Sequence, residues 1–221
     1  ETNPEALDAM VRFLDSEHHA GACGVQLLNS DGSLQESYFN IPLPLMRKFE
    51  SGDAHKRITA ALMRLPALGA PSARPRTRRV DIVKGACLMI RRKALEDVGP
   101  LDEDSFLYAD DTDWCIRARK RGWSAYILED NTIVHHGYAS TDQETYITIT
   151  SSRRSALLLY RKHYPAPVFA AWKLFILGEI IYKHHLNRSR VERGRADEKT
   201  KEKYRAYKTL YDELILKKKE F

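Results

Sequence analysis

Three acidic side chains, Asp110, Asp111 and Asp113, lie within four residues at the predicted start of a helix. Acids in a first helical turn accept hydrogen bonds from backbone N–H groups and complement the helix dipole, which would account for one of them. Three carboxylates this close repel one another, and a cation, a proton or a ligand hydroxyl relieves the repulsion. The cluster therefore indicates a general base that accepts a proton from a hydroxyl group, or a site for Mg2+ or Mn2+.

A histidine pair, His135-His136, follows the next predicted strand. Such a pair is more often a surface or core feature than a ligand. A single imidazole that returns to the sheet edge carrying the carboxylates could nevertheless complete a divalent metal site. The sequence does not decide between a surface or core histidine pair and a metal ligand.

Helices and strands alternate before this region. Asn3-Pro4-Glu5 favours a helix start, because Asn caps the backbone, Pro fits the first turn and Glu complements the dipole. Residues 21–28 predict a buried strand, residues 29–33 a turn and residues 34–39 a partner strand. The apolar residues at helical spacing in the first helix are Leu7, Met10, Val11 and Leu14.

Small residues precede the acidic cluster. Gly85-Ala86 lies between two short apolar runs, residues 80–83 and 87–90, which indicates close approach of a ligand or another backbone. Residues 93–98 predict a short helix. Asp111 or Thr112 is expected to cap the following helix, which ends at Gly122, and residues 123–128 predict a strand.

Residues 40–79 break the regular pattern with repeated prolines. We expect an irregular surface excursion there, with one short helix near residues 55–63 and a closing basic run at residues 74–79.

Composition indicates an ordinary globular protein. The 221 residues are 43% hydrophobic and 30% charged, which excludes a disordered or fibrous chain. Cys23, Cys87 and Cys115 lie far apart, and their odd number fits neither a disulfide framework nor a zinc site with paired cysteines. A reducing compartment, the cytoplasm, is therefore expected.

Positive charge is concentrated in the last third of the chain. Residues 1–152 hold 18 Lys and Arg against 22 Asp and Glu, whereas residues 153–221 hold 18 against 8. A basic and partly apolar end favours an anionic partner, either a membrane surface or a nucleic acid. Nucleic acid ranks lower, because interleaved aromatic stacking motifs are lacking.

The C-terminal third is predicted to be helical over residues 143–163, 168–185 and 198–219. Lys173 and Glu179 interrupt the most apolar stretch, so no segment predicts a spanning helix. Two interpretations remain for that stretch. It packs on the rest of the protein, or it lies on a membrane with Trp172 and Tyr182 at headgroup depth.

These residues resemble the second half of the family 2 inverting glycosyltransferases, and the rhamnosyl- and galactofuranosyltransferase-like enzymes most of all. The similarity spans roughly residues 3–163, including residues 24–28 and 31–35, which resemble the segment after the family's metal-binding aspartates. Its most specific part comprises residues 85–94, 98–103, 106–113, Arg117, Gly122-Trp123 and residues 135–140.

The resemblance implies a GT-A fold, a mixed α/β sheet flanked by helices, with direct displacement at the anomeric carbon of a nucleotide-sugar. It implies that Asp111 is the catalytic base, that Asp110 replaces the usual Glu of a Glu-Asp pair, and that Asp113 contacts the acceptor. A divalent cation, Mg2+ or Mn2+, would act as a Lewis acid on the leaving diphosphate. The remaining implied site residues are Gly85, Ala86 and Trp123 at the acceptor and His135 at the metal.

Residues 1–150 are therefore expected to form the acceptor-side part of the catalytic domain, and residues 151–221 a basic helical region. We expect the family's nucleotide-binding N-terminal half to be missing from this chain, which alone would then neither bind nucleotide-sugar strongly nor turn over. The predicted function is sugar transfer from a nucleotide-sugar to a glycan or lipid-linked acceptor in cell-envelope polysaccharide assembly. The alternative is a non-catalytic glycan- or membrane-binding fragment. Expected partners include an anionic surface at the inner face of the cytoplasmic membrane and a second copy of the chain.

Overall fold

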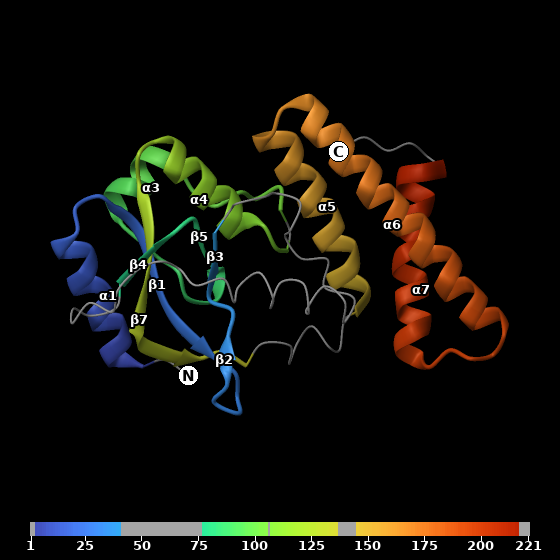
Figure 1. Cartoon of the computed structure of the whole chain (residues 1–221), viewed down its shortest axis with the longest axis horizontal. Helices are drawn as coiled ribbons and strands as arrows, with labels where there is room; N and C mark the ends of the chain where they lie inside the picture. The colour runs from blue at the N-terminus through green and yellow to red at the C-terminus, as the bar shows by residue number, and fades with distance from the viewer. Residues whose placement is uncertain (1–2, 41–76, 106, 137–144, 217–221) are drawn as a thin grey trace, which may run out of the picture.

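The computed structural model describes residues 3–40, 77–105, 107–136 and 145–216, and these contain a five-stranded mixed sheet (Figure 1). The long strands β1 (Ala20–Leu28) and β7 (Ser124–Val134) run parallel at its centre. The remaining strands pair antiparallel with these two: β2 (Leu34–Gln35) and β6 (Met89–Ile90) with β1, and β4 (Thr77–Val80) with β7. The predicted mixed α/β sheet, consistent with a GT-A-like fold, is thus present.

Helices cover both faces of the sheet, which explains why β1 is buried along most of its length. α1 (Pro4–Ser16) lies on one face, where Met10 and Leu14 pack with Cys23 and Val25 of β1. α3 (Arg92–Val98) and α4 (Asp110–Lys120) lie on the other face, where Trp114 packs with Ala22. Successive residues of a strand point to opposite faces, so Ala22 packs with α3 and α4 while Cys23 packs with α1.

The first helix begins as the sequence predicts. The side chain of Asn3 accepts a hydrogen bond from the backbone N–H of Glu5 at 3.0 Å, and Pro4 is the first helical residue. The predicted strand, turn and partner strand are also confirmed through β1 and β2. The partner segment splits, however, because β3 (Tyr38–Phe39) leaves the main sheet to pair with β5 (Ile82–Val83).

The irregular excursion ends earlier than predicted. Arg78 and Arg79, assigned to its closing basic run, lie in β4 and pair with Ile127 and Tyr126 of β7. Pairing with the long central strand β7 thus makes this basic segment a strand, although its charge had suggested part of the irregular excursion. The helix expected near residues 55–63 lies outside the described residues.

The C-terminal third forms a helical unit beside the sheet (Figure 1). It contains α5 (Thr145–His163), α6 (Ala166–Glu192) and α7 (Glu198–Tyr211), followed by the short π-helical turn η3 (Asp212–Leu216). Tyr160 of α5 stacks on Trp172 of α6, with ring centroids 4.5 Å apart. The boundary expected after residue 150 falls inside α5.

Among the described helices, none is long and apolar enough to cross a membrane. The placement of Trp172 at headgroup depth was wrong. This side chain is buried in the core of the helical unit, because α5 and α7 pack on the face of α6 that carries it.

Candidate functional site

The backbone immediately before the acidic cluster is unusual. Tyr108 and Ala109 have φ values of 70° and 71°, in the left-handed region that residues with a Cβ atom rarely adopt. Ala109 is the residue that precedes α4, and it makes no side-chain capping hydrogen bond. The prediction that Asp111 or Thr112 caps the helix was therefore wrong: the turn at residues 108–109 starts α4 early enough to include all three acids.

Asp111 lies where α4 meets the Gly85-Ala86 segment. Its Oδ2 accepts a hydrogen bond from the backbone N–H of Gly85 at 2.9 Å, and its Oδ1 accepts one from the hydroxyl of Thr112 at 3.0 Å. Gly85 and Ala86 are exposed, whereas Asp111 is half-buried. The carboxylate is thus held in a fixed orientation beside an exposed stretch of small residues, as a general base requires.

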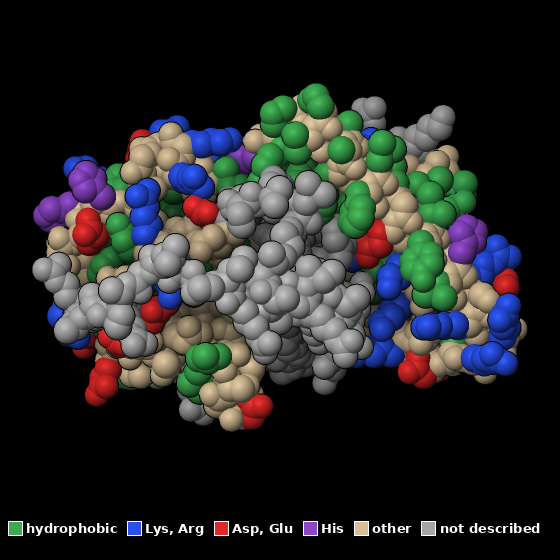
Figure 2. All heavy atoms as spheres, viewed as in Figure 1, with side chains coloured by type: hydrophobic (Ala, Val, Ile, Leu, Met, Phe, Trp, Pro, Cys, Tyr) green, Lys and Arg blue, Asp and Glu red, His purple; other side chains and the backbone are tan. Residues whose placement is uncertain are grey.

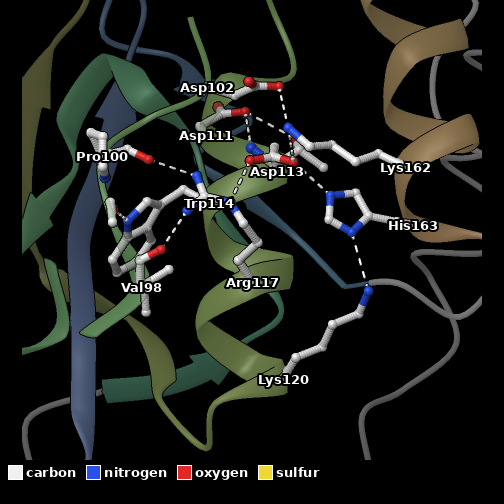
Figure 3. Close-up of polar contacts among 12 residues, drawn as sticks. Val98, Pro100, Asp102, Asp111, Asp113, Trp114, Arg117, Lys120, Lys162 and His163 are labelled. Carbon is white, nitrogen blue, oxygen red and sulfur yellow. Dashed lines mark hydrogen bonds and ion pairs between the residues drawn. The ribbon is translucent and has the colours of Figure 1, made fainter. Parts of the chain in front are cut away.

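Asp113 occupies a different environment, although it lies only two residues away. Its side chain is 2% exposed, and its two oxygens are bonded by side chains from two helices (Figure 3). Nε of Arg117 donates to Oδ2 at 2.6 Å, and Nε2 of His163 lies 2.6 Å from Oδ1. Burial by itself raises the pKa of Asp113, but these hydrogen bonds outweigh it and hold the pKa below its usual value.

Two lysines extend this cluster. Nζ of Lys120 lies 3.2 Å from Nδ1 of His163, and an ammonium group can only donate, so Nδ1 accepts and Nε2–H donates to Asp113. Nζ of Lys162 lies 3.0 Å from Oδ2 of Asp102 and 3.8 Å from Oδ1 of Asp113. The C-terminal end of α5 is therefore fastened to α4 and to the loop before it.

α4 also fixes the loop that follows α3. Nη1 and Nη2 of Arg117 donate to the carbonyl oxygens of Val98 and Pro100, at 2.8 and 2.7 Å. Nε1 of Trp114 donates to the carbonyl oxygen of Gly99 at 2.9 Å. One helix thus orients both the acidic cluster and the backbone of residues 98–100 (Figure 3).

His135 lies at the end of β7, where its backbone N–H donates to the carbonyl oxygen of Leu28 at 2.9 Å. Its Nδ1 lies 2.7 Å from Oε1 of Gln35 in β2, an acceptor, so the hydrogen sits on Nδ1 and the lone pair on Nε2. Burial lowers the pKa of His135 most, and the charge of Lys84 lowers it further. The ring is therefore kept in the neutral form that can ligate a metal.

Lys84 lies next to Gly85 in the chain, and its charge acts on His135. Its ammonium group pairs with Glu36 of the β2–β3 connection at 3.0 Å and acts electrostatically on His135. The next residue, Gly85, donates to Asp111. The structure therefore brings Asp111 into direct contact with the Gly85-Ala86 segment, while the direct hydrogen-bond partners of His135 are Gln35 and Leu28.

Trp123 does not join them. It follows the C-terminal end of α4, and a helix of 11 residues places that end about 15 Å from Asp110. Nε1 of Trp123 donates to Oδ2 of Asp97 at 2.8 Å, and the side chain borders a depression of about 370 Å³ together with Trp114 and Arg119.

Comparison with known proteins bears on this arrangement. A profile described as "Glycosyltransferase like family 2" matches residues 2–161, which include α1, the sheet and most of α5. The chain belongs to glycosyltransferase family 2.

Two curated relatives of this glycosyltransferase family 2 chain come from Mycobacterium tuberculosis, strains CDC 1551 / Oshkosh and ATCC 25618 / H37Rv. Both are named N-acetylglucosaminyl-diphospho-decaprenol L-rhamnosyltransferase, and each is 27% identical over 196 residues. The match takes in 87% of this chain but only 62% of each relative's length.

The described residues of this family 2 chain include a candidate metal ligand, His135, but no complete set of ligands. The Nδ1 atom of His135 is bonded to Gln35, the kind of outer partner that fixes the orientation of an imidazole. Within the described ranges, however, no group of three or more His, Cys, Asp or Glu side chains is arranged to hold an ion. The described residues thus do not form a complete metal centre by themselves.

Sequence reasoning about the acidic cluster missed His163 and Lys162. They lie 50 and 49 residues beyond Asp113, at the end of a helix predicted only for its periodicity. Ser155 of the same helix was also missed, and its hydroxyl donates to the carbonyl oxygen of Leu107 at 2.9 Å. No local pattern marks these residues, because their partners come from another element of the glycosyltransferase fold.

Proposed function

We propose that this chain is the acceptor-side part of an inverting, nucleotide-sugar-dependent glycosyltransferase in which Asp111 is the general base. The observation that carries the proposal is the contact of Asp111 with the backbone N–H of Gly85 at 2.9 Å. It orients a carboxylate beside exposed small residues, where an acceptor hydroxyl can approach. Membership of family 2 supports the reaction class.

The proposed step is a single displacement. Asp111 takes the proton of the acceptor hydroxyl as its oxygen forms a bond to the anomeric carbon of the donor sugar. The bond from that carbon to the diphosphate oxygen breaks, and the nucleoside diphosphate leaves with the electron pair. Attack from the face opposite to the leaving group inverts the anomeric centre.

The neighbouring residues have supporting roles in this proposal. Gly85 and Ala86 border the acceptor, and Asp110 adds negative charge at the first position of α4. Asp113 is buried and bonded by Arg117 and His163, so we propose that it positions the start of α4 instead of contacting the acceptor. Trp123, at the far end of α4, is left out of the acceptor site.

The names of the two relatives suggest a class of donor and acceptor for this protein. Their name specifies an L-rhamnosyl group and an N-acetylglucosaminyl diphosphate carried on a polyprenol. We propose an activated deoxyhexose donor and a lipid-linked glycan acceptor of cell-envelope assembly for the protein that contains this chain. A divalent cation, with His135 as one ligand, would supply Lewis-acid assistance to the leaving diphosphate when bound.

The test is sugar transfer by the full-length protein that carries this chain, with nucleoside-diphospho-rhamnose and a short-chain lipid-linked N-acetylglucosamine acceptor. Asp111→Asn should lower kcat/KM by about 10²–10⁴-fold, the usual contribution of a positioned general base. Asp110→Asn is the matched control, with a smaller loss expected. An anomeric configuration retained in the product, or full activity of Asp111→Asn, would overturn the assignment.

A further inference from the structure

The outer face of α6 is apolar over more than four turns. From Pro167 to Tyr182, the exposed positions of this fully described helix carry no charged side chain. Leu174 is 70% exposed, Phe175 52% and Tyr182 62%. The outer face, defined as Pro167, Val168, Ala171, Leu174, Phe175, Gly178, Ile181 and Tyr182, is a continuous strip about 22 Å long.

The opposite face of α6 is apolar for a different reason. Trp172, Ile176 and Ile180 are buried against α5 and α7 in the core of the helical unit. The helix is thus hydrophobic on both sides, and the described part of the chain packs on only one of them. Exposed apolar strips of this size on a folded protein mark a surface that contacts something else.

Basic residues gather where this strip ends. Figure 2 shows hydrophobic side chains along α6 that give way to Lys and Arg side chains around the turn into α7. The last turn of α6 and the turn itself contribute Arg188, Arg190, Arg193 and Arg195. Glu179, the acid in the middle of α6, is turned inward and bonded to Arg153 at 2.8 Å, so it does not offset this charge.

We propose that the outer face of α6 lies on an anionic lipid surface, with the helix parallel to the membrane plane. The apolar strip would enter the boundary between headgroups and acyl chains, and the arginines at its end would contact lipid phosphates. This places Tyr182 at the headgroup level, while Trp172 stays in the protein core.

Charge favours lipid over a second copy of the chain. In a dimer formed through α6, the arginines of one copy would lie against the second copy. They would meet either its uncharged strip or its arginines, and neither supplies negative charge. The one acid on the exposed C-terminal part of α6, Glu192, already pairs with Arg188 at 2.8 Å. A lipid surface supplies the missing negative charge along the whole basic end.

The proposed surface also connects to the candidate active site. α5 precedes α6 directly, and its last residue, His163, bonds to Asp113 at the start of α4. A membrane under α6 would thus hold the acidic cluster at a fixed height above the lipid, where a lipid-linked acceptor is presented. Only this last step rests on the proposed function.

The experiment is co-sedimentation of the full chain with vesicles of phosphatidylcholine alone and of phosphatidylcholine with phosphatidylglycerol. Binding is expected to the anionic vesicles and to fall when salt shortens the Debye length from about 10 Å at 0.1 M to about 3 Å at 1 M. The double variant Leu174→Glu, Phe175→Glu should weaken binding about tenfold or more, because two side chains of this size no longer leave water.

Leu34→Glu is the matched control. Leu34 is 74% exposed on β2, away from the helical unit, so the same change there should leave vesicle binding as it is. Thermal unfolding of both variants checks that they are folded. Equal binding by the double variant and the parent, or binding to neither kind of vesicle, would overturn the proposal. So would a dimer, seen by sedimentation velocity, that the double variant dissociates while no vesicle binds.

Different variants test the membrane proposal and the proposed function, so the failure of one can be told from the failure of the other. Asp111→Asn should bind vesicles like the parent, because Asp111 lies outside the helical unit. The Leu174, Phe175 double variant should retain transfer to a water-soluble acceptor but lose transfer to acceptor embedded in vesicles. Loss of transfer to both acceptors would instead place α6 in the catalytic machinery and contradict a purely membrane-facing role.

Discussion

Nε2 of His163 lies 2.6 Å from Oδ1 of Asp113, and this contact joins the last residue of α5 to the first turn of α4. Both side chains are almost fully buried, at 4% and 2% exposed. Arg117 bonds the other oxygen of Asp113 from one turn further along α4. The helical unit and the candidate catalytic helix therefore share one buried carboxylate.

Removal of that carboxylate should destabilise the protein strongly. Asp113→Ala is expected to lower the free energy of unfolding by about 3 kcal/mol, because it removes the buried acid that His163 and the partly exposed Arg117 share. His163→Ala should cost about 1–3 kcal/mol, since it leaves one oxygen of Asp113 without its donor. Urea denaturation measures both. Asp8→Ala, an exposed acid on α1, should change stability by less than about 0.5 kcal/mol, and an equal loss there would contradict this account.

Acid should remove the contribution of Asp113. Its pKa is lowered in the folded protein, because hydrogen bonds from His163 and Arg117 outweigh the effect of burial. The stabilisation is fully present above the unfolded value of about 3.9 and is lost as pH falls through the lower folded value. The stability difference between the parent and Asp113→Asn should therefore shrink below about pH 4. Denaturation midpoints that differ equally at neutral and strongly acidic pH would argue against it.

The two adjacent histidines should behave differently toward metal. In the full-length protein, His135→Ala should raise the Mn2+ concentration needed for half-maximal transfer, and Gln35→Ala should raise it about 10–100-fold through loss of ring orientation. His136 is exposed and bonded to Ser30, so His136→Ala is the control and should leave the Mn2+ requirement unchanged. A Mn2+ titration of transfer rates that ranks His136 above His135 would contradict the assignment.

The left-handed residue before α4 offers a test of backbone strain. Ala109→Gly should raise the free energy of unfolding by up to about 1 kcal/mol, because glycine has no Cβ penalty at a φ of 71°. Ala171→Gly, at an exposed position in the second turn of α6, should have the opposite sign and cost about 1 kcal/mol. The same direction of change for both, measured by thermal unfolding, would show that the turn stores no strain.

Much of the local structure could be predicted from the sequence. Asn3 and Pro4 start α1, and helical periodicity predicts α5, α6 and α7, although α6 continues to Glu192, beyond its predicted end at residue 185. These features depend on neighbours in the chain, such as a side chain that caps its own helix. The left-handed turn at Tyr108 and Ala109 was not predictable, because neither residue favours that conformation and the contact of Ser155 with Leu107 comes from α5.

The sequence by itself determined the family and the candidate residues, Asp111, Gly85 and His135 among them, because these depend on residue types in a fixed order. Only the tertiary structure decided which of three neighbouring acids faces Gly85 and which is buried under His163. It also decided that Trp172 lies in a core while Leu174 and Phe175 face outward. The physical reason is that burial and pairing are set by elements far away in the chain, and periodicity cannot say which face of a helix they cover.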